Sequence, residues 1–153
     1  MGGRKTAECV FCEIIAHRLP AWWVEEGTGA VAFLTIQPLA EGHTLVIPRG
    51  HAPTLEDVRP DERSEMWSLV HRISERMRHV GLAEGVNLLV ASGRAAEQGV
   101  FHLHVHVIPR RPGDTVGFNA WIDSKVRSVP EARQRELSER LRSDAPRRPG
   151  PSP

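Results

Sequence analysis

Strict alternation of polar and apolar residues marks the segment 101–109 of this chain. Three histidines on one side of the pattern face three aliphatic residues on the other: His102, His104 and His106 alternate with Leu103, Val105 and Val107. Because successive side chains of a strand point to opposite faces, the pattern predicts a strand with its aliphatic side chains in the core. Its three imidazoles would share the other face, about 6.6 Å apart.

Other hydrophobic patterns predict the remaining elements. Apolar runs bounded by turn residues predict strands over 30–36, 43–47 and 86–90. Apolar residues spaced by three and four predict a long amphipathic helix over 60–80, with Asp61 and Glu62 in its first turn and Gly81 after its end. Shorter helices are predicted over 11–17 and 131–141. Strands in pairs around one long helix indicate an α+β fold with a largely antiparallel sheet.

The length of 153 residues suits one domain with short ends. We expect a flexible N-terminus over 1–8, a single domain over 9–144 and a disordered tail over 145–153, where proline and glycine are dense.

The composition argues against two classes of partner, nucleic acids and membranes. With 20 basic and 19 acidic residues the net charge is +1, which argues against recruitment of nucleic acid or anionic lipid. No apolar run approaches the ~20 residues of a membrane span, and no hydrophobic segment follows Arg4 and Lys5 as in a secretory signal. The sequence predicts a cytoplasmic protein without a nucleic-acid or membrane partner.

The three histidines in register leave three interpretations open. They are the polar face of an ordinary amphipathic strand, a three-histidine metal centre with an open position for water, or a nucleophilic imidazole whose neighbours orient it and handle protons. Three side chains in a straight row are too far apart to converge on one ion, which favours nucleophilic catalysis. The pair Cys9 and Cys12 alone fits a redox pair, two buried thiols or metal ligands equally well.

The motif His-x-His-x-His followed by two apolar residues, at 102–108, resembles the signature of the histidine triad (HIT) family of nucleotide hydrolases and transferases. Further segments match in order: 9–15, 31–34, 42–48 with His51, Gln98, and 109–110. The resemblance covers core motifs over 9–110, with a C-terminal extension that holds the helix at 131–141. It is strongest to the zinc-containing bacterial Hit, or Hint-like, branch.

That resemblance implies a HIT-like fold. Its mostly antiparallel five-stranded sheet, with one long helix and several short ones, would extend across a homodimer. It also implies cleavage at the α-phosphate of nucleoside phosphoramidates or dinucleoside polyphosphates through a nucleotidyl-histidine intermediate, with a purine nucleotide as the substrate.

By the same resemblance, His104 is the nucleophile, His43 and His106 form a supporting relay, and Gln98 holds the phosphate. An apolar slot for the base, with Thr35 beside the ribose, would comprise Val10, Phe11, Ile14, Leu19 and Phe33. One structural Zn²⁺ per chain would be bound in a closed tetrahedral site by Cys9, Cys12, His51 and His102.

Three positions depart from the family pattern. Thr35 stands where many relatives have an aspartate that contacts the ribose hydroxyls, Ala91 replaces an asparagine or glutamine, and Gly99 replaces a hydroxyl residue. Losing one well-placed donor to a phosphate costs about 10²–10³ in rate by analogy with oxyanion holes. These departures favour an alternative function, a low-turnover nucleotide-binding or sensing protein of the same fold.

Overall fold

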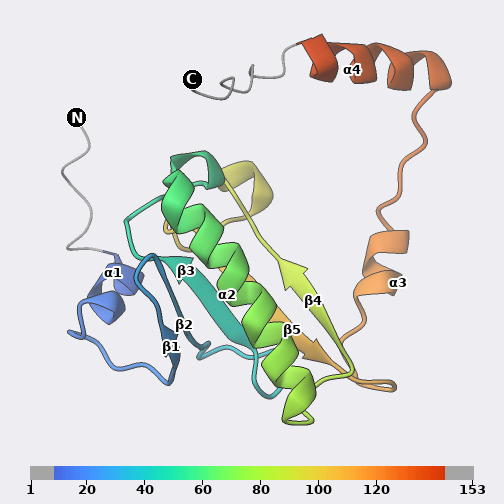
Figure 1. The fold of residues 1–153 in the computed structure, drawn as a ribbon. Helices are drawn as coiled ribbons and strands as arrows, with labels where there is room; N and C mark the ends of the chain where they lie inside the picture. Colours follow the sequence, from blue (N-terminus) through green and yellow to red (C-terminus); the bar gives the residue numbers. More distant parts are fainter. Residues whose placement is uncertain (1–8, 144–153) are drawn as a thin grey trace, which may run out of the picture. The chain divides into compact units, whose positions relative to one another are not determined.

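The structure is a computed structural model that describes residues 9–143 (Figure 1). The termini predicted to be flexible, 1–8 and 145–153, lie outside the described residues. The chain divides into two compact units between Val116 and Gly117. All the family motifs over 9–110 lie in the first unit, while the predicted domain over 9–144 spans parts of both.

A five-stranded antiparallel sheet forms the first unit, in the order β1-β2-β3-β5-β4. The strands are β1 (Trp23–Glu26), β2 (Ala30–Leu34), β3 (Thr44–Pro48), β4 (Gly85–Leu89) and β5 (Val105–Arg110). This confirms the predicted fold class. The hydrophobic pattern missed β1 because the strand has only four residues, two of them glutamates.

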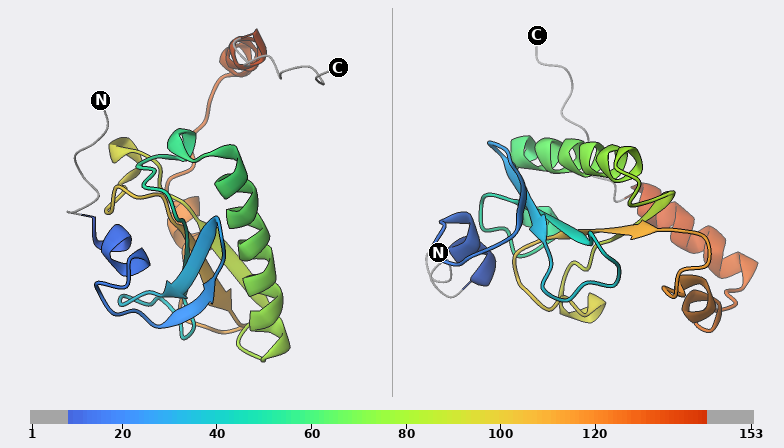
Figure 2. Two further views of the ribbon diagram at one scale, coloured as in Figure 1. Left: turned by 60° about the vertical axis from the view of Figure 1, so that its left-hand side comes forward. Right: turned by 90° about the horizontal axis from the view of Figure 1, so that it is seen from below.

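Helix α2 (Pro60–His79) runs along one face of the sheet (Figure 2). Its apolar stripe joins the inward side chains of β5 in the main core cluster: Met66, Leu69, Ile73, Val105 and Val107. The helix ends one residue before the predicted bound. Gly81 takes a φ of 74°, and the N–H of Leu82 turns back to the carbonyl of Met77.

Helix α1 (Val10–Ile15) belongs to a second core cluster, in which Phe11 and Ile14 pack with Phe33, Leu45 and Ile47. It is shorter than the predicted helix over 11–17 because His17 adopts a φ of 56°, which turns the chain out of the helix. Two short 3₁₀ helices, η1 (Leu55–Asp57) and η2 (Arg94–Ala96), lie in the loops after β3 and β4.

The second unit contains α3 (Phe118–Asp123) and α4 (Glu131–Ser143). The helix predicted over 131–141 is α4, and α3 was not predicted. Within residues 9–143, no helix is both long enough and apolar enough to cross a membrane.

Candidate functional site

The three histidines of the motif follow one another at the start of β5, but only His106 lies in the strand. The prediction that one strand holds all three is wrong for His102 and His104. The β3–β5 ladder stops at the pair Val46 and Val105, and the N–H of Leu103 instead donates to Ala52 O at 2.7 Å. The alternation survives, since Leu103 is fully buried in the core cluster beneath α2.

The imidazole of His104 is held in one tautomer by the main chain. Its Nδ1 lies 2.8 Å from the carbonyl oxygen of His102, so Nδ1 carries the proton and donates it. The lone pair of the neutral ring is therefore on Nε2. Burial lowers the pKa of His104, which keeps the ring neutral at pH 7. Phe11 contacts the ring edge-on with a centroid distance of 5.2 Å.

One main-chain donor fixes the protonation of a pair of imidazoles, His43 and His106. The N–H of Leu39 donates to His43 Nδ1 at 3.1 Å, so the proton of a neutral His43 is on Nε2. That nitrogen lies 2.9 Å from His106 Nδ1 and donates to it. The proton of His106 is consequently on Nε2, the nitrogen that is free to donate to a ligand.

Both members of this pair are neutral at pH 7. Burial lowers the pKa of His43, and burial with the neighbouring His104 and His43 lowers the pKa of His106 to about 4. The His106 ring lies next to that of His104, with centroids 4.9 Å apart. The site therefore pairs a ring with a free lone pair and a ring with a free N–H.

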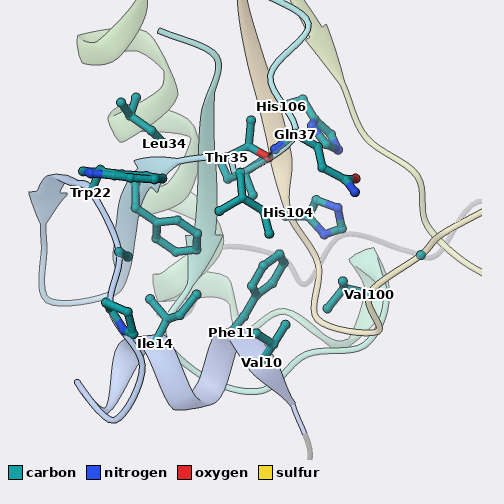
Figure 3. A pocket seen from close by; sticks show the side chains of 16 residues that line it. Val10, Phe11, Ile14, Trp22, Leu34, Thr35, Gln37, Val100, His104 and His106 are labelled. Carbon is teal, nitrogen blue, oxygen red and sulfur yellow. Dashed lines mark hydrogen bonds between the residues drawn. The ribbon is translucent and has the colours of Figure 1, made fainter.

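His104 and His106 border a cavity of about 670 Å³, whereas His43 lies behind His106 and outside the lining. Figure 3 shows His104, His106 and Gln37 at one end of it and Trp22, Leu34 and Ile14 at the other. The cavity is mostly apolar, and no lysine, arginine or carboxylate is found among the described residues that line it. Its polar side chains are the two imidazoles, Thr35 and Gln37.

Five of the residues predicted to contact a substrate line this cavity: Val10, Phe11, Ile14, Phe33 and Thr35. Leu19 does not; it lies outside the lining with 41% of its surface exposed. It follows α1 after the turn at His17, which carries it away from the face formed by Phe11 and Ile14.

Gln98 is also absent from the cavity lining, although it is buried. Its Nε2 donates to Pro53 O at 2.6 Å and to Val100 O at 2.9 Å, while its Oε1 accepts from the N–H of Gly93 at 2.7 Å. Both amide protons are thus used within the protein. The side chain holds the loop before His102 instead of reaching into the cavity.

The cavity also includes residues that the sequence analysis did not select. They are Pro20, Ala21, Trp22, Leu34, Ile36, Gln37, Leu45 and Val100; Gly99, one of the three departures from the family pattern, also lines the cavity. Thr35 accepts the N–H of Gln37 on its hydroxyl, so its own proton is free for a ligand. The pair Gln37-Pro38, which closes the apolar run, was the local signal that the chain leaves the sheet here; β2 itself ends earlier, at Leu34.

The four predicted metal ligands, which are far apart in sequence, meet in one cluster. The ligand atoms of Cys9, Cys12, His51 and His102 all lie within 4.8 Å of one another. Cys12 Sγ is 3.4 Å from His51 Nδ1 and 3.5 Å from His102 Nδ1, and Cys9 Sγ is 3.6 Å from His102 Nδ1. A tetrahedral zinc with ordinary bond lengths separates sulfur and nitrogen ligands by about 3.5–3.6 Å.

The surroundings of His102 support the fit. Its Nε2 lies 2.8 Å from Pro48 O and donates to it, which leaves the lone pair on Nδ1, the atom that faces the cysteines. Burial lowers the pKa of His102 to about 4, so the ring is neutral as a ligand must be. Burial and then Cys9 raise the pKa of the Cys12 thiol to about 12, so this thiol would release its proton as a cation binds.

This arrangement separates the three histidines of the motif. His102 faces the cysteines, His106 faces His43, and His104 lies between them at the cavity. Their nitrogens do not converge on one point, which argues against a three-histidine metal centre.

Comparison with known proteins gives consistent results. The profile of the HIT domain matches residues 18–113. An uncharacterised HIT-like protein of Mycobacterium tuberculosis is 43% identical over 106 residues, which is 69% of this chain and 74% of that protein. The adenosine 5′-monophosphoramidase of Candida albicans is 35% identical over 109 residues, covering 69% of this chain and 72% of its own.

A solved structure has a similar fold. The zinc-bound histidine triad family protein of Mycobacterium smegmatis superimposes with a TM-score of 0.69 and 35% identity, over 90% of this chain and 98% of that one.

Proposed function

This chain belongs to the HIT domain family, and on that premise we propose that it is a hydrolase that cleaves nucleoside phosphoramidates at the α-phosphorus with His104 as the nucleophile. One observation carries the proposal. A buried, neutral imidazole with its lone pair on Nε2 borders the cavity beside a second imidazole whose Nε2 carries a proton.

The first step of the proposed reaction uses both rings. His104 Nε2 bonds to phosphorus as the bond from phosphorus to the leaving nitrogen breaks. The leaving nitrogen takes a proton from solvent and departs as a neutral amine, while the Nε2–H of the neutral His106 donates a hydrogen bond to a phosphoryl oxygen. The carbonyl of His102 accepts a hydrogen bond from Nδ1 of the phosphorylated ring and stabilises its positive charge.

Water completes the cycle. Its oxygen bonds to phosphorus, the bond to His104 Nε2 breaks, and the proton that the water loses goes to solvent. The products are a nucleoside monophosphate and an amine. His43 keeps His106 in the required tautomer in both steps because its own Nδ1 is occupied by the N–H of Leu39.

The polarity of the cavity favours phosphoramidates over dinucleoside polyphosphates. A polyphosphate chain carries several negative charges, which enzymes meet with lysine, arginine or a metal ion. None of the described lining residues is a lysine or an arginine. A phosphoramidate monoanion carries one negative charge and needs fewer cationic groups around it. The relative in Candida albicans is named as an adenosine 5′-monophosphoramidase.

We further propose that Cys9, Cys12, His51 and His102 hold one Zn²⁺. Bound there, the ion has a structural role, since four protein ligands leave no open position. The site joins the start of α1, with the residue before it, and the loop after β3 to the residue two positions before His104.

A homodimer is the proposed assembly. Strand β4 is at one edge of the sheet, where Leu88 and Leu89 are exposed by 47% and 46%. A second copy paired along this edge would cover both leucines.

The test is a panel of adenosine substrates with different leaving groups, namely amidates, anhydrides and sulfates. The wild type should release AMP from the amidate fastest. His104→Ala should abolish release while AMP binding, measured by calorimetry, stays within a few-fold. Trapping a nucleotide on His104 after acid-free quenching would establish the intermediate.

Position 35 has a threonine instead of an aspartate, and position 99 lacks a hydroxyl. Both differences favour the second candidate, a nucleotide-binding or sensing protein. Tight AMP binding by the wild type, with no product from any substrate after long incubation, would support that function and refute the hydrolase.

A further inference from the structure

One aromatic side chain borders the cavity without a ring or hydrogen-bond partner among the described residues. The indole of Trp22 has 66% of its surface exposed, yet it lines the cavity. Among the contacts made by residues 9–143, no ring contact and no side-chain hydrogen bond involves Trp22. Its neighbour Trp23 behaves differently, because it packs edge-on against Phe33 with a centroid distance of 5.7 Å.

The backbone of Trp22 is nevertheless fixed. Its carbonyl accepts the N–H of Leu34 at 2.9 Å, and Trp23 begins β1 opposite Phe33. The indole therefore extends from a residue tied to β2, the strand that leads to Thr35. With two side-chain torsions, a tryptophan anchored in this way presents a large surface at small entropic cost.

The place of Trp22 in the cavity indicates what it meets. Figure 3 shows the indole at the end away from His104, with Thr35 between them. A nucleotide whose phosphorus is at His104 has its ribose next and its base farthest away. The base is thus the part of the substrate that reaches Trp22.

The chemistry of this end suits the face of a base better than its edge. The side chains labelled near Trp22 in Figure 3, Ile14 and Leu34, are apolar. They offer no acceptor or donor to a base, and Trp22 itself adds only one N–H. Stacking on an aromatic side chain tolerates every base, because each has a π-face, and grows with the area of overlap.

We infer that Trp22 is a specificity-determining residue, whose indole stacks on the base of the substrate and selects by stacking area instead of by hydrogen bonds to the base edge. This inference rests on the proposed function, because the phosphorus at His104 sets which part of the ligand lies at Trp22. It makes a purine substrate better than a pyrimidine one, with a modest difference between adenine and guanine.

The experiment compares steady-state kinetics of the full chain with adenosine, guanosine and uridine 5′-phosphoramidates and with an abasic 1-O-methylribose 5-phosphoramidate. Trp22→Ala should raise KM for the adenosine and guanosine substrates about tenfold, with a smaller rise for uridine. The abasic substrate should be unaffected, and kcat should stay within about twofold for all four. Trp22→Phe should restore most of the loss.

Trp67→Ala is the matched control. Trp67 is 42% exposed on α2, the helix that packs with the main core cluster, and it does not line the cavity. Its removal should leave every KM unchanged.

The failure of this inference is distinct from failure of the proposed function. Calorimetric titration with AMP needs no turnover, so the affinity of Trp22→Ala can be compared with that of the wild type in either case. Absence of cleavage by the wild type refutes the proposed hydrolase. Unchanged AMP affinity in Trp22→Ala, an equal rise of KM for the abasic substrate, or a change only in sedimentation, as at a protein contact, refutes the role given to Trp22.

Discussion

Replacing Gln98 by methionine tests whether this side chain supports the loop or binds the substrate. Methionine has nearly the same length but makes none of the three hydrogen bonds to Gly93, Pro53 and Val100. A neutral hydrogen bond contributes about 1 kcal/mol, so the variant should lose about 3 kcal/mol of unfolding free energy. In a unit of this size that lowers the melting temperature by roughly 10 °C.

Differential scanning calorimetry measures the loss, and Gln37→Met provides the matched control. Gln37 undergoes the same chemical change at the cavity, and its side chain has no hydrogen bond to any described residue. Its melting temperature should stay within about 2 °C of the wild type, since exposed substitutions rarely exceed ±0.5 kcal/mol.

The kinetic result completes the comparison. The loop that Gln98 holds includes Gly99 and Val100, which line the cavity, so Gln98→Met should also lower kcat/KM. If Gln98→Met has the melting temperature of the wild type yet loses activity a hundredfold, the side chain contacts the phosphate. The loop-supporting role would then be wrong.

Three further predictions concern the phosphate end, the titration of the relay and the metal cluster. A Cβ at Gly99 meets no heavy atom within 4 Å, so a side chain fits there. Gly99→Ser should add a donor and raise kcat/KM about tenfold, whereas Gly99→Ala should leave it unchanged. Equal rates for the two variants would contradict this. Because burial lowers the pKa of the nucleophile His104 and of His106 below 6.5, the cleavage rate should hold as pH falls through 6.5 and drop only below it; an acid limb centred near 6.5 would refute the neutral site. The unfolding free energy, measured with urea, should fall as the pH falls from 6.5 toward 4, because the imidazole of His106 binds a proton in this range when the chain is unfolded and not when it is folded. Removing zinc with a chelator should lower the melting temperature by roughly 10 °C or more, and Cys12→Ser should abolish that response; lost activity at unchanged stability would exclude a structural ion.

The hydrophobic pattern predicted most of the sheet because local periodicity decides which side of an element is buried. Leu103, Val105 and Val107 are buried as the alternation indicated, and α2 ends within one residue of the predicted bound. The strand that was missed, β1, is short and polar. Its place depends on pairing with β2 and not on a pattern of its own.

By itself, then, the sequence determined which residues belong to the core, where the long helix runs, and which residue types are available for chemistry. Only the tertiary structure decided how they meet. Cys9 and His102, 93 positions apart, come together because the start of α1 packs on β2 and β3 and because β3 pairs with β5. The tautomer of His106 depends on its hydrogen bond from His43, 63 positions away, and the place of Trp22 depends on its bond to Leu34 in the next strand. No local pattern encodes either contact.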